Sequence, residues 1–204
     1  MKKYKEIIKK NVKWIILFIA ILVFGYIVNR ISQNDISQID NQIYQITTLF
    51  MCPEVTNILK IITHFGDWMA MIPIAIAVLI KNRKYGILVS INLISIFAFN
   101  QMLKLLFNRP RPIGNRLIEA GGYSFPSGHS MVSMAFYGFL IYLIYKNMKN
   151  IKWKYIFCVL LSMLILIIGF SRIYLGVHYA SDVAGGFLLS LAYLIVYVQV
   201  TKEI

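Results

Sequence analysis

The chain has 204 residues, 59% of them hydrophobic, and its mean hydropathy is +0.69. A soluble domain of this length has no need of repeated apolar runs long enough to cross a bilayer, so the composition indicates an integral membrane protein. The formal net charge is +13, but the lysines cluster between the apolar runs, where the positive-inside rule explains them better than nucleic-acid binding does.

The first apolar run, residues 14–28, follows a lysine-rich head and therefore resembles a secretory signal peptide. Residues 29–32 offer no small-residue cleavage site and further apolar runs follow, so we expect an uncleaved transmembrane helix. The polar residues 32–45 are expected to be an external connector with a short helix, in which Asp35 and Asp40 have no further role.

Five more spans are predicted after this connector. Residues 56–80 form the second span, although Lys60, His64 and Asp67 make its first half polar, and we expect that half to lie in the interface or to face the bundle interior. The other four cover residues 85–107, 130–145, 155–170 and 183–200. A 20-residue helix spans the hydrocarbon core of about 30 Å. Residues 1–204 are therefore expected to form a single all-α membrane domain, a six-helix bundle.

The basic residues predict the sidedness of this bundle. Of the 21 Lys and Arg residues, 14 lie in the N-terminal head, in residues 81–84, in residues 146–154 and at Lys202. This side should be cytoplasmic, with both chain termini there, in a multi-pass protein of the plasma membrane. The loops that carry the motifs described next would then lie on the outer face.

The two cysteines, Cys52 and Cys158, lie in different predicted segments. A disulfide framework or a metal site would need more ligands at tighter spacing, so we expect two small core-type residues.

The first motif runs from Lys104 to Pro112. Lys104 ends a helix, and Arg111 lies in a stretch that two prolines keep from being helical. A snorkelling lysine with a basic interfacial loop is one interpretation, but a stiffened guanidinium fork favours phosphate binding. Arg109 and Arg116 are expected to be solvated loop charges, with attraction of anionic headgroups as the alternative.

The second motif, residues 126–129, precedes an apolar helix. Free N–H groups at a helix start, together with the Ser127 hydroxyl and Gly128, are suited to an anion, although ordinary N-capping by Ser127 is equally compatible. His129 would be a natural proton donor to a leaving alkoxide, whereas a lone histidine is more often structural.

Three residues outside the motifs are assigned supporting roles. Tyr123 and Phe125 are expected to line the entrance for an acyl or prenyl chain, because they lead into the second motif. Asp67, preceded by Gly66, is expected to lie near the site as a supporting hydrogen-bond acceptor.

The third motif, residues 171–182, is the strongest single signal. His178 and Asp182 are four positions apart, so on a helix they share a face and can hydrogen-bond. A carboxylate on one ring nitrogen leaves the other free to attack a substrate. A simple helix-end ion pair would not explain why Arg172 and two further basic elements recur on the same side of the membrane.

These three motifs, in this order and spacing between residues 104 and 182, resemble the signature of the type 2 phosphatidic acid phosphatase family, and the resemblance extends over residues 56–200. It implies that His178 is a nucleophile that forms a phosphohistidine and that Asp182 orients it. His129 would protonate the leaving oxygen and later activate water.

The same resemblance implies which residues bind the phosphate, namely Lys104, Arg111 and Arg172 with donors from Ser127 and Gly128. No metal or other cofactor is expected, and no protein partner is predicted. The implied substrate is a membrane lipid phosphate such as phosphatidylglycerophosphate, phosphatidic acid or undecaprenyl diphosphate. Undecaprenyl-diphosphate recycling as the main role, a haloperoxidase-like or phosphotransfer use of the pocket, and a non-catalytic lipid-phosphate binding or transport protein are the alternatives.

Overall fold

The computed structural model describes residues 2–114 and 116–202, and within them the chain is helical with no strand. The helices are α1 (Lys2–Ser32), α2 (Ser37–Thr48), α3 (Pro53–Thr63), the short 3-10 helix η1 (His64–Gly66), α4 (Trp68–Lys81), α5 (Arg83–Phe107), α6 (Gly128–Asn147), α7 (Ile151–Tyr174) and α8 (Ala180–Thr201). The prediction of an all-α protein is therefore confirmed for the described residues.

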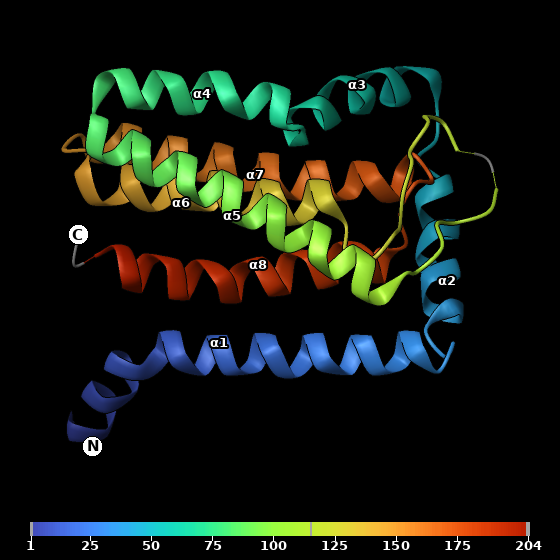
Figure 1. The fold of residues 1–204 in the computed structure, drawn as a ribbon, viewed down its shortest axis with the longest axis horizontal. Coiled ribbons are helices and arrows are strands. Elements are labelled where there is room, and N and C mark those ends of the chain that lie inside the picture. Colours follow the sequence, from blue (N-terminus) through green and yellow to red (C-terminus); the bar gives the residue numbers. More distant parts are fainter. Residues whose placement is uncertain (1, 115, 203–204) are drawn as a thin grey trace.

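The long helices α1, α5, α6, α7 and α8 run along one common direction, while α2 lies across one end of the bundle (Figure 1). Both ends of the chain lie at the opposite end of the bundle from α2 and from the loop between α5 and α6 (Figure 1). The termini and the motif loops are therefore separated by the length of the bundle.

Five helical segments among the described residues are long and apolar enough to cross a membrane, namely residues 11–32 of α1 and the whole of α5, α6, α7 and α8. The predicted second span is not one continuous helix, because residues 56–80 divide into α3, η1 and the 14-residue α4. A sixth candidate, Ser37–Thr48 with Pro53–Gly66, is bent by 119°.

The break in the predicted second span has a packing cause at Gly66. A Cβ atom there would come within 2.8 Å of both His129 Cδ2 and Ile168 Cγ2, so the chain approaches α6 and α7 as closely as a glycine permits. Asp67 follows in an extended conformation, and α4 begins at Trp68. The interruption therefore brings Asp67 next to α6.

Local sequence signals set several helix ends. The Asn82 side chain accepts a hydrogen bond from the Tyr85 amide at the start of α5, and Asn150 does the same for Trp153 at the start of α7. At the other end of α5, Asn108 adopts the left-handed conformation that stops a helix. Two prolines then keep the following loop from continuing it.

The core lies between α4, α5, α6, α7 and α8, around fully buried side chains such as Ile96, Phe136 and Ile168. A separate aromatic cluster joins α1 to this bundle, because the Phe125 ring packs 5.7 Å from that of Phe24 and 5.1 Å from that of Phe107. Phe125 has no exposed surface, so the prediction that it lines the substrate entrance is wrong. Its role is to anchor the second motif against α1 and α5.

Candidate active site

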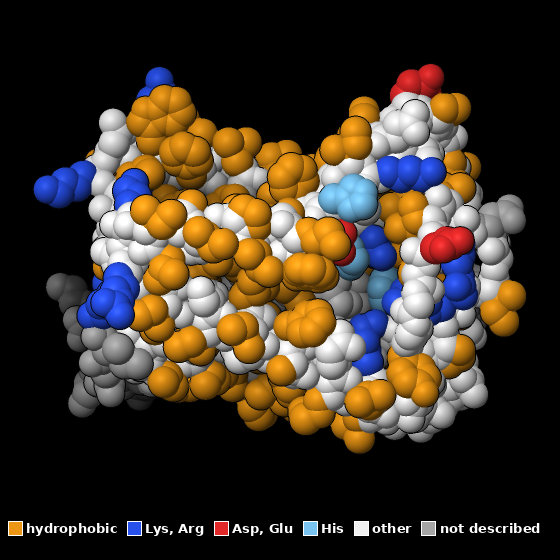
Figure 2. Space-filling model, turned by 45° about the horizontal axis from the view of Figure 1, so that its top comes forward, with side chains coloured by type: hydrophobic (Ala, Val, Ile, Leu, Met, Phe, Trp, Pro, Cys, Tyr) orange, Lys and Arg blue, Asp and Glu red, His pale blue; other side chains and the backbone are white. Residues whose placement is uncertain are grey.

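A cavity of about 490 Å³ opens near the end of the bundle at which α2 lies. Histidine, lysine and arginine side chains gather in a hollow of this face, which adjoins a largely hydrophobic surface on one side (Figure 2). Six of the eight predicted site residues line the cavity, and they come from all three motifs: Lys104, Arg111, Gly128, His129, Arg172 and His178. Chain segments far apart in the sequence therefore converge on one volume.

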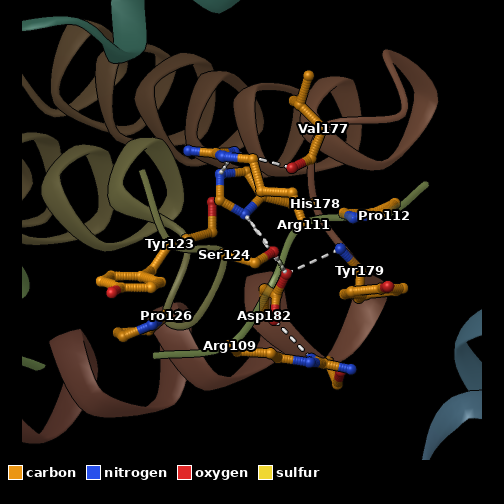
Figure 3. Close-up of polar contacts among 12 residues, drawn as sticks. Arg109, Arg111, Pro112, Tyr123, Ser124, Pro126, Val177, His178, Tyr179 and Asp182 are labelled. Carbon is orange, nitrogen blue, oxygen red and sulfur yellow. Dashed lines mark hydrogen bonds and ion pairs between the residues drawn. The ribbon is translucent and has the colours of Figure 1, made fainter. Parts of the chain in front are cut away.

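His178 lies in the turn between α7 and α8, and its contacts define its tautomer. Arg111 Nη1 lies 3.1 Å from His178 Nε2, and since a guanidinium can only donate, Nε2 must be the acceptor (Figure 3). The hydrogen then sits on Nδ1, which is 3.4 Å from Asp182 Oδ2. The predicted pairing of His178 with Asp182 is present, and the lone pair on Nε2 accepts the hydrogen bond from Arg111.

The charge state of His178 is set by its surroundings. Burial lowers the pKa of His178 to about 3, and the charges of Arg172 and Arg111 act in the same direction, while Asp182 opposes them. The imidazole is therefore neutral at physiological pH. A neutral imidazole with its lone pair on Nε2 is the form in which histidine is a nucleophile.

Asp182 lies behind His178 and does not line the cavity. It has no exposed surface and belongs to the first turn of α8, where it accepts a hydrogen bond from the Tyr179 amide at 2.9 Å. The Ser124 hydroxyl also donates to Asp182 (Figure 3). Ser124 lies just before the second motif, and its type and position gave no signal in the sequence.

Arg109 contradicts its predicted role as a solvated loop charge. Its side chain is 10% exposed and bridges two carboxylates, with Nη1 2.6 Å from Asp182 Oδ1 and Nη2 2.8 Å from Asp40 Oδ2. Asp40 was expected to have no further role, yet it is 2% exposed and also accepts a hydrogen bond from the Ser181 amide at 2.8 Å. The connector helix α2 is thus tied to the start of α8.

The predicted phosphate-binding cations differ in how firmly they are held. Arg111 donates to the carbonyl oxygens of Val177 and Gly121 at 2.8 and 2.7 Å, and burial lowers the pKa of Arg111, which nevertheless stays charged. Lys104 donates to the Tyr123 carbonyl, and Tyr123 lines the cavity, while its contact with an acyl or prenyl chain stays a prediction.

Arg172 is the most buried of the three cations, at 4% exposure. Its Nη1 donates to the Thr63 hydroxyl at 2.7 Å, whereas its Nε has no hydrogen-bond partner among the described residues. A buried donor without a partner costs free energy unless a ligand satisfies it. Its position at the cavity fits an anion better than a structural role.

His129 begins α6 and faces the same cavity. Its Nε2 lies 2.8 Å from Asp67 Oδ1, and Asp67 Oδ2 is 3.2 Å from Nδ1 of His64. The expected hydrogen-bond acceptor near the site is therefore present, and the break between η1 and α4 places it there. The Asp67 carboxylate therefore fixes the orientation of the His129 ring at the cavity wall.

The second motif divides between the cavity and the core. Gly128 lines the cavity, where a Cβ atom would lie only 3.1 Å from Asn100 Oδ1, and the first amides of α6 have no partner within the helix. Ser127 is completely buried outside the cavity, and its hydroxyl accepts a hydrogen bond from Ser130 at 3.0 Å. Its side chain makes no capping bond, so the N-capping interpretation is wrong.

Among residues 2–114 and 116–202 no group of three or more His, Cys, Asp and Glu side chains is placed to hold a metal ion. Cys52 and Cys158 are both unpaired thiols in the described structure, but Cys52 is exposed, so the prediction that it is a core-type residue is wrong. Independence from metals stays a prediction.

The helical bundle and a cavity lined by cations and histidines define a membrane phosphatase fold and site, and the chain belongs to the PAP2 superfamily, whose family model matches residues 84–204. The chain is 30% identical over 176 residues to phosphatidylglycerophosphatase B of Bacillus subtilis, covering 83% of this chain and 87% of the relative. It is 24% identical over 206 residues to undecaprenyl-diphosphatase of Sulfolobus acidocaldarius, covering 96% and 95%.

Solved structures agree with this assignment. The crystal structure of a transmembrane PAP2 type phosphatidylglycerolphosphate phosphatase from Bacillus subtilis superimposes with a TM-score of 0.85 at 26% identity, covering 92% of this chain and 96% of that one. The LpxE structure from Aquifex aeolicus has the same fold, with a TM-score of 0.65 at 20% identity over 80% of this chain and 94% of that one. The predictions of the family and of a phosphatase are confirmed.

Proposed function

We propose that this protein hydrolyses a phosphate or diphosphate group on a membrane lipid through a phosphohistidine on His178. The observation that carries the proposal is the neutral His178 imidazole, whose Nε2 lone pair lies 3.1 Å from Arg111 Nη1 at the wall of a cationic cavity. A phosphate oxygen that takes over this Arg111 donor comes to lie beside the nucleophile. Residues 1–204 act in this proposal as one membrane domain.

In the first step, the Nε2 lone pair of His178 attacks phosphorus and the bond from phosphorus to the lipid oxygen breaks. The charge that develops on the imidazole is balanced by Asp182 across the Nδ1–H bond. His129, held by Asp67, donates its proton to the leaving lipid oxygen. The lipid product therefore departs as a neutral hydroxyl or as a lipid phosphate.

In the second step, His129 takes a proton from water while the water oxygen attacks phosphorus. The bond from phosphorus to Nε2 breaks, phosphate leaves, and both histidines return to their starting states. Lys104, Arg111 and Arg172, with the amides at the start of α6, stabilise the charge on the equatorial oxygens in both steps. Each such donor contributes about 2.7–4 kcal/mol of transition-state stabilisation.

A lipid substrate is supported by an apolar groove of about 540 Å³ along α4 and α5. Trp68 and Phe97 line both this groove and the phosphate cavity, so the two are continuous. A hydrocarbon chain in the groove would keep its phosphate end in the cavity. We propose phosphatidylglycerophosphate, phosphatidic acid and undecaprenyl diphosphate as substrates, with recycling of undecaprenyl diphosphate as an alternative main role.

The deciding experiment measures phosphate release from these three lipids by detergent-purified protein and by the His178→Asn variant. With substrate labelled at the terminal phosphate, the wild type should yield labelled protein that is stable in alkali and labile in acid, and the variant should yield none. Turnover without labelled protein would overturn the phosphohistidine. Lipid binding without turnover would support the non-catalytic alternative, and halide oxidation would support the haloperoxidase-like one.

We further propose that the cavity faces the outside of the plasma membrane and that both termini are cytoplasmic. Support comes from the excess of basic residues at the end of the bundle that holds the termini. Exposed Cys52, just before α3 at the α2 end of the bundle, is a built-in reporter. A membrane-impermeant maleimide should label it in intact cells and should not label Cys52→Ser. Labelling only after lysis would reverse the orientation.

A further inference from the structure

We propose that Asp40, on the connector helix α2, is a positioning residue for the reaction and acts through Arg109 on Asp182. This inference rests on the proposed function, because it concerns the same histidine nucleophile. Asp40 is not one of the residues that line the phosphate cavity, so it acts without touching the substrate.

Asp40 is held more tightly than an anchor for a surface helix requires. Its Oδ1 accepts a hydrogen bond from the Ser181 amide at 2.8 Å, and its Oδ2 accepts from the Ser181 hydroxyl at 2.7 Å and from Arg109 at 2.8 Å. These contacts hold the Asp40 carboxylate against Ser181, the residue next to Asp182. A change at Asp40 therefore alters the hydrogen bonds of Ser181, the residue that precedes Asp182.

Arg109 connects the two carboxylates. Besides its bonds to Asp40 and Asp182, its Nη1 donates to the Ser181 hydroxyl at 2.8 Å, and its guanidinium lies 4.1 Å from the centre of the Tyr179 ring. Figure 3 shows Arg109 reaching Asp182 from the side opposite to His178. The position of Asp182 Oδ1 is thus set by Arg109, and that of Oδ2, which faces His178, follows from it.

The charges explain why an arginine at this position needs a second carboxylate. If Arg109 paired with Asp182 alone, its positive charge would offset the negative charge that Asp182 presents to His178. Asp40 shares that positive charge, so one net negative charge remains on the group of Asp40, Arg109 and Asp182 in a buried environment. That remaining charge stabilises the imidazolium of the phosphohistidine.

This reasoning separates the two chemical steps. Removing the charge of Asp40 weakens the stabilisation of positively charged phosphohistidine, so formation of the intermediate should slow while its hydrolysis should not. A role limited to anchoring α2 would instead lower the unfolding temperature and change both steps alike. Substrate affinity should stay nearly constant in either case, because the cavity is untouched.

The test compares Asp40→Asn with Asp35→Asn. Asp35 lies just before α2, but its side chain is 52% exposed and its ion pair is with partly exposed Arg30, so it is a matched control. We expect Asp40→Asn to lower kcat by about 10- to 100-fold, as is common for residues that orient a functional group, with KM within about twofold of wild type. Rapid-quench labelling should show slower formation and unslowed hydrolysis of the phosphohistidine.

Each outcome decides the matter. The proposal would be overturned if Asp40→Asn had the same kcat as Asp35→Asn. It would also be overturned if Asp40→Asn slowed formation and hydrolysis of the phosphohistidine equally. If Asp40→Asn does not fold, Ser181→Ala takes its place, because it removes one hydroxyl from the same hydrogen-bond network. Ser181→Ala should lower kcat at constant KM, and a wild-type kcat in this variant would overturn the proposal. A wild type that hydrolyses lipid without a labelled histidine would refute the intermediate, and Asp40 would still be judged by kcat.

Discussion

Replacing Arg172 with glutamine gives the most direct test of how the cavity binds phosphate. The arginine is buried in the cavity wall, its Nη1 donates to Thr63, and its Nε has no hydrogen-bond partner within the described parts of the chain. Glutamine keeps a polar group of shorter reach but removes the charge and the guanidinium fork. The change should therefore remove stabilisation that the dianionic transition state receives and the resting protein does not need.

The expected size follows from the number of donors lost. One charged donor aimed at a developing oxyanion contributes about 2.7–4 kcal/mol, which corresponds to a loss of about 10²- to 10³-fold in kcat/KM. Arg172→Lys restores the charge but not the planar fork, so it should recover only part of the loss. Stability should change little, because removing the buried Nε, which has no hydrogen-bond partner among the described residues, offsets the loss of the bond to Thr63.

The assay is phosphate release in detergent over a range of lipid concentrations, with unfolding temperature recorded for every variant. Arg116→Gln is the matched control, since Arg116 is an exposed arginine of the loop after the first motif and, among the described residues, donates to the Pro112 carbonyl alone. It should retain activity close to wild type. Arg172→Gln within tenfold of wild type, in folded protein, would refute the assignment of Arg172 to the phosphate.

Three further outcomes are expected. Gly66→Ala should displace the His129 ring and lower kcat by about 10- to 100-fold, since its Cβ would meet that ring at 2.8 Å. Gly25→Ala should leave kcat unchanged, because among the described residues no heavy atom beyond the chain neighbours and the local helix backbone lies within 4 Å of the added Cβ. Burial lowers the pKa of His178 from 6.5 to about 3, so below pH 6.5 the unfolded chain binds a proton that the folded chain does not. The folded state therefore loses stability relative to the unfolded chain as pH falls from 6.5 toward 3, and His178 causes no such loss above pH 6.5. The unfolding temperature of His178→Asn should depend less on pH over this range than that of the wild type. Excess EDTA should leave lipid phosphate release unchanged, and a loss restored by a divalent cation would contradict metal independence.

The sequence predicted the long helices well because each is an apolar run bounded by a local signal. Runs at residues 85–107 and 155–170 correspond to α5 and α7, whose starts are capped by Asn82 and Asn150. The break at Gly66 and Asp67 was missed, because the composition of a segment shows that it is apolar but not which side chains it packs against. Here the His129 ring on α6 leaves room only for a glycine at position 66. Helix length is a local property, whereas that contact is a long-range one.

The same distinction explains which site residues could be predicted. Lys104, Arg111, His129 and His178 lie in short motifs whose spacing is itself the signal, and all four line the cavity. Ser127 lies in a motif too, but its hydroxyl points into the core, since Ser130 on the next helical turn supplies its hydrogen bond. A motif identifies residues that belong together but does not say which of their atoms face the substrate.

Asp40 could not have been found from the sequence, and the reason bears on how the site works. It lies 141 positions from Ser181, on a polar connector where an aspartate is unremarkable, and only the folded chain brings it to the start of α8. Arg109 likewise has the appearance of one more basic loop residue until its two carboxylate partners are known. In the proposed reaction, His178 and the three cations act on the phosphate, and Arg109 with Asp40 balances the charge around Asp182. If this division is correct, the strength of the His178 nucleophile depends on α2, a helix that contributes nothing to the phosphate cavity.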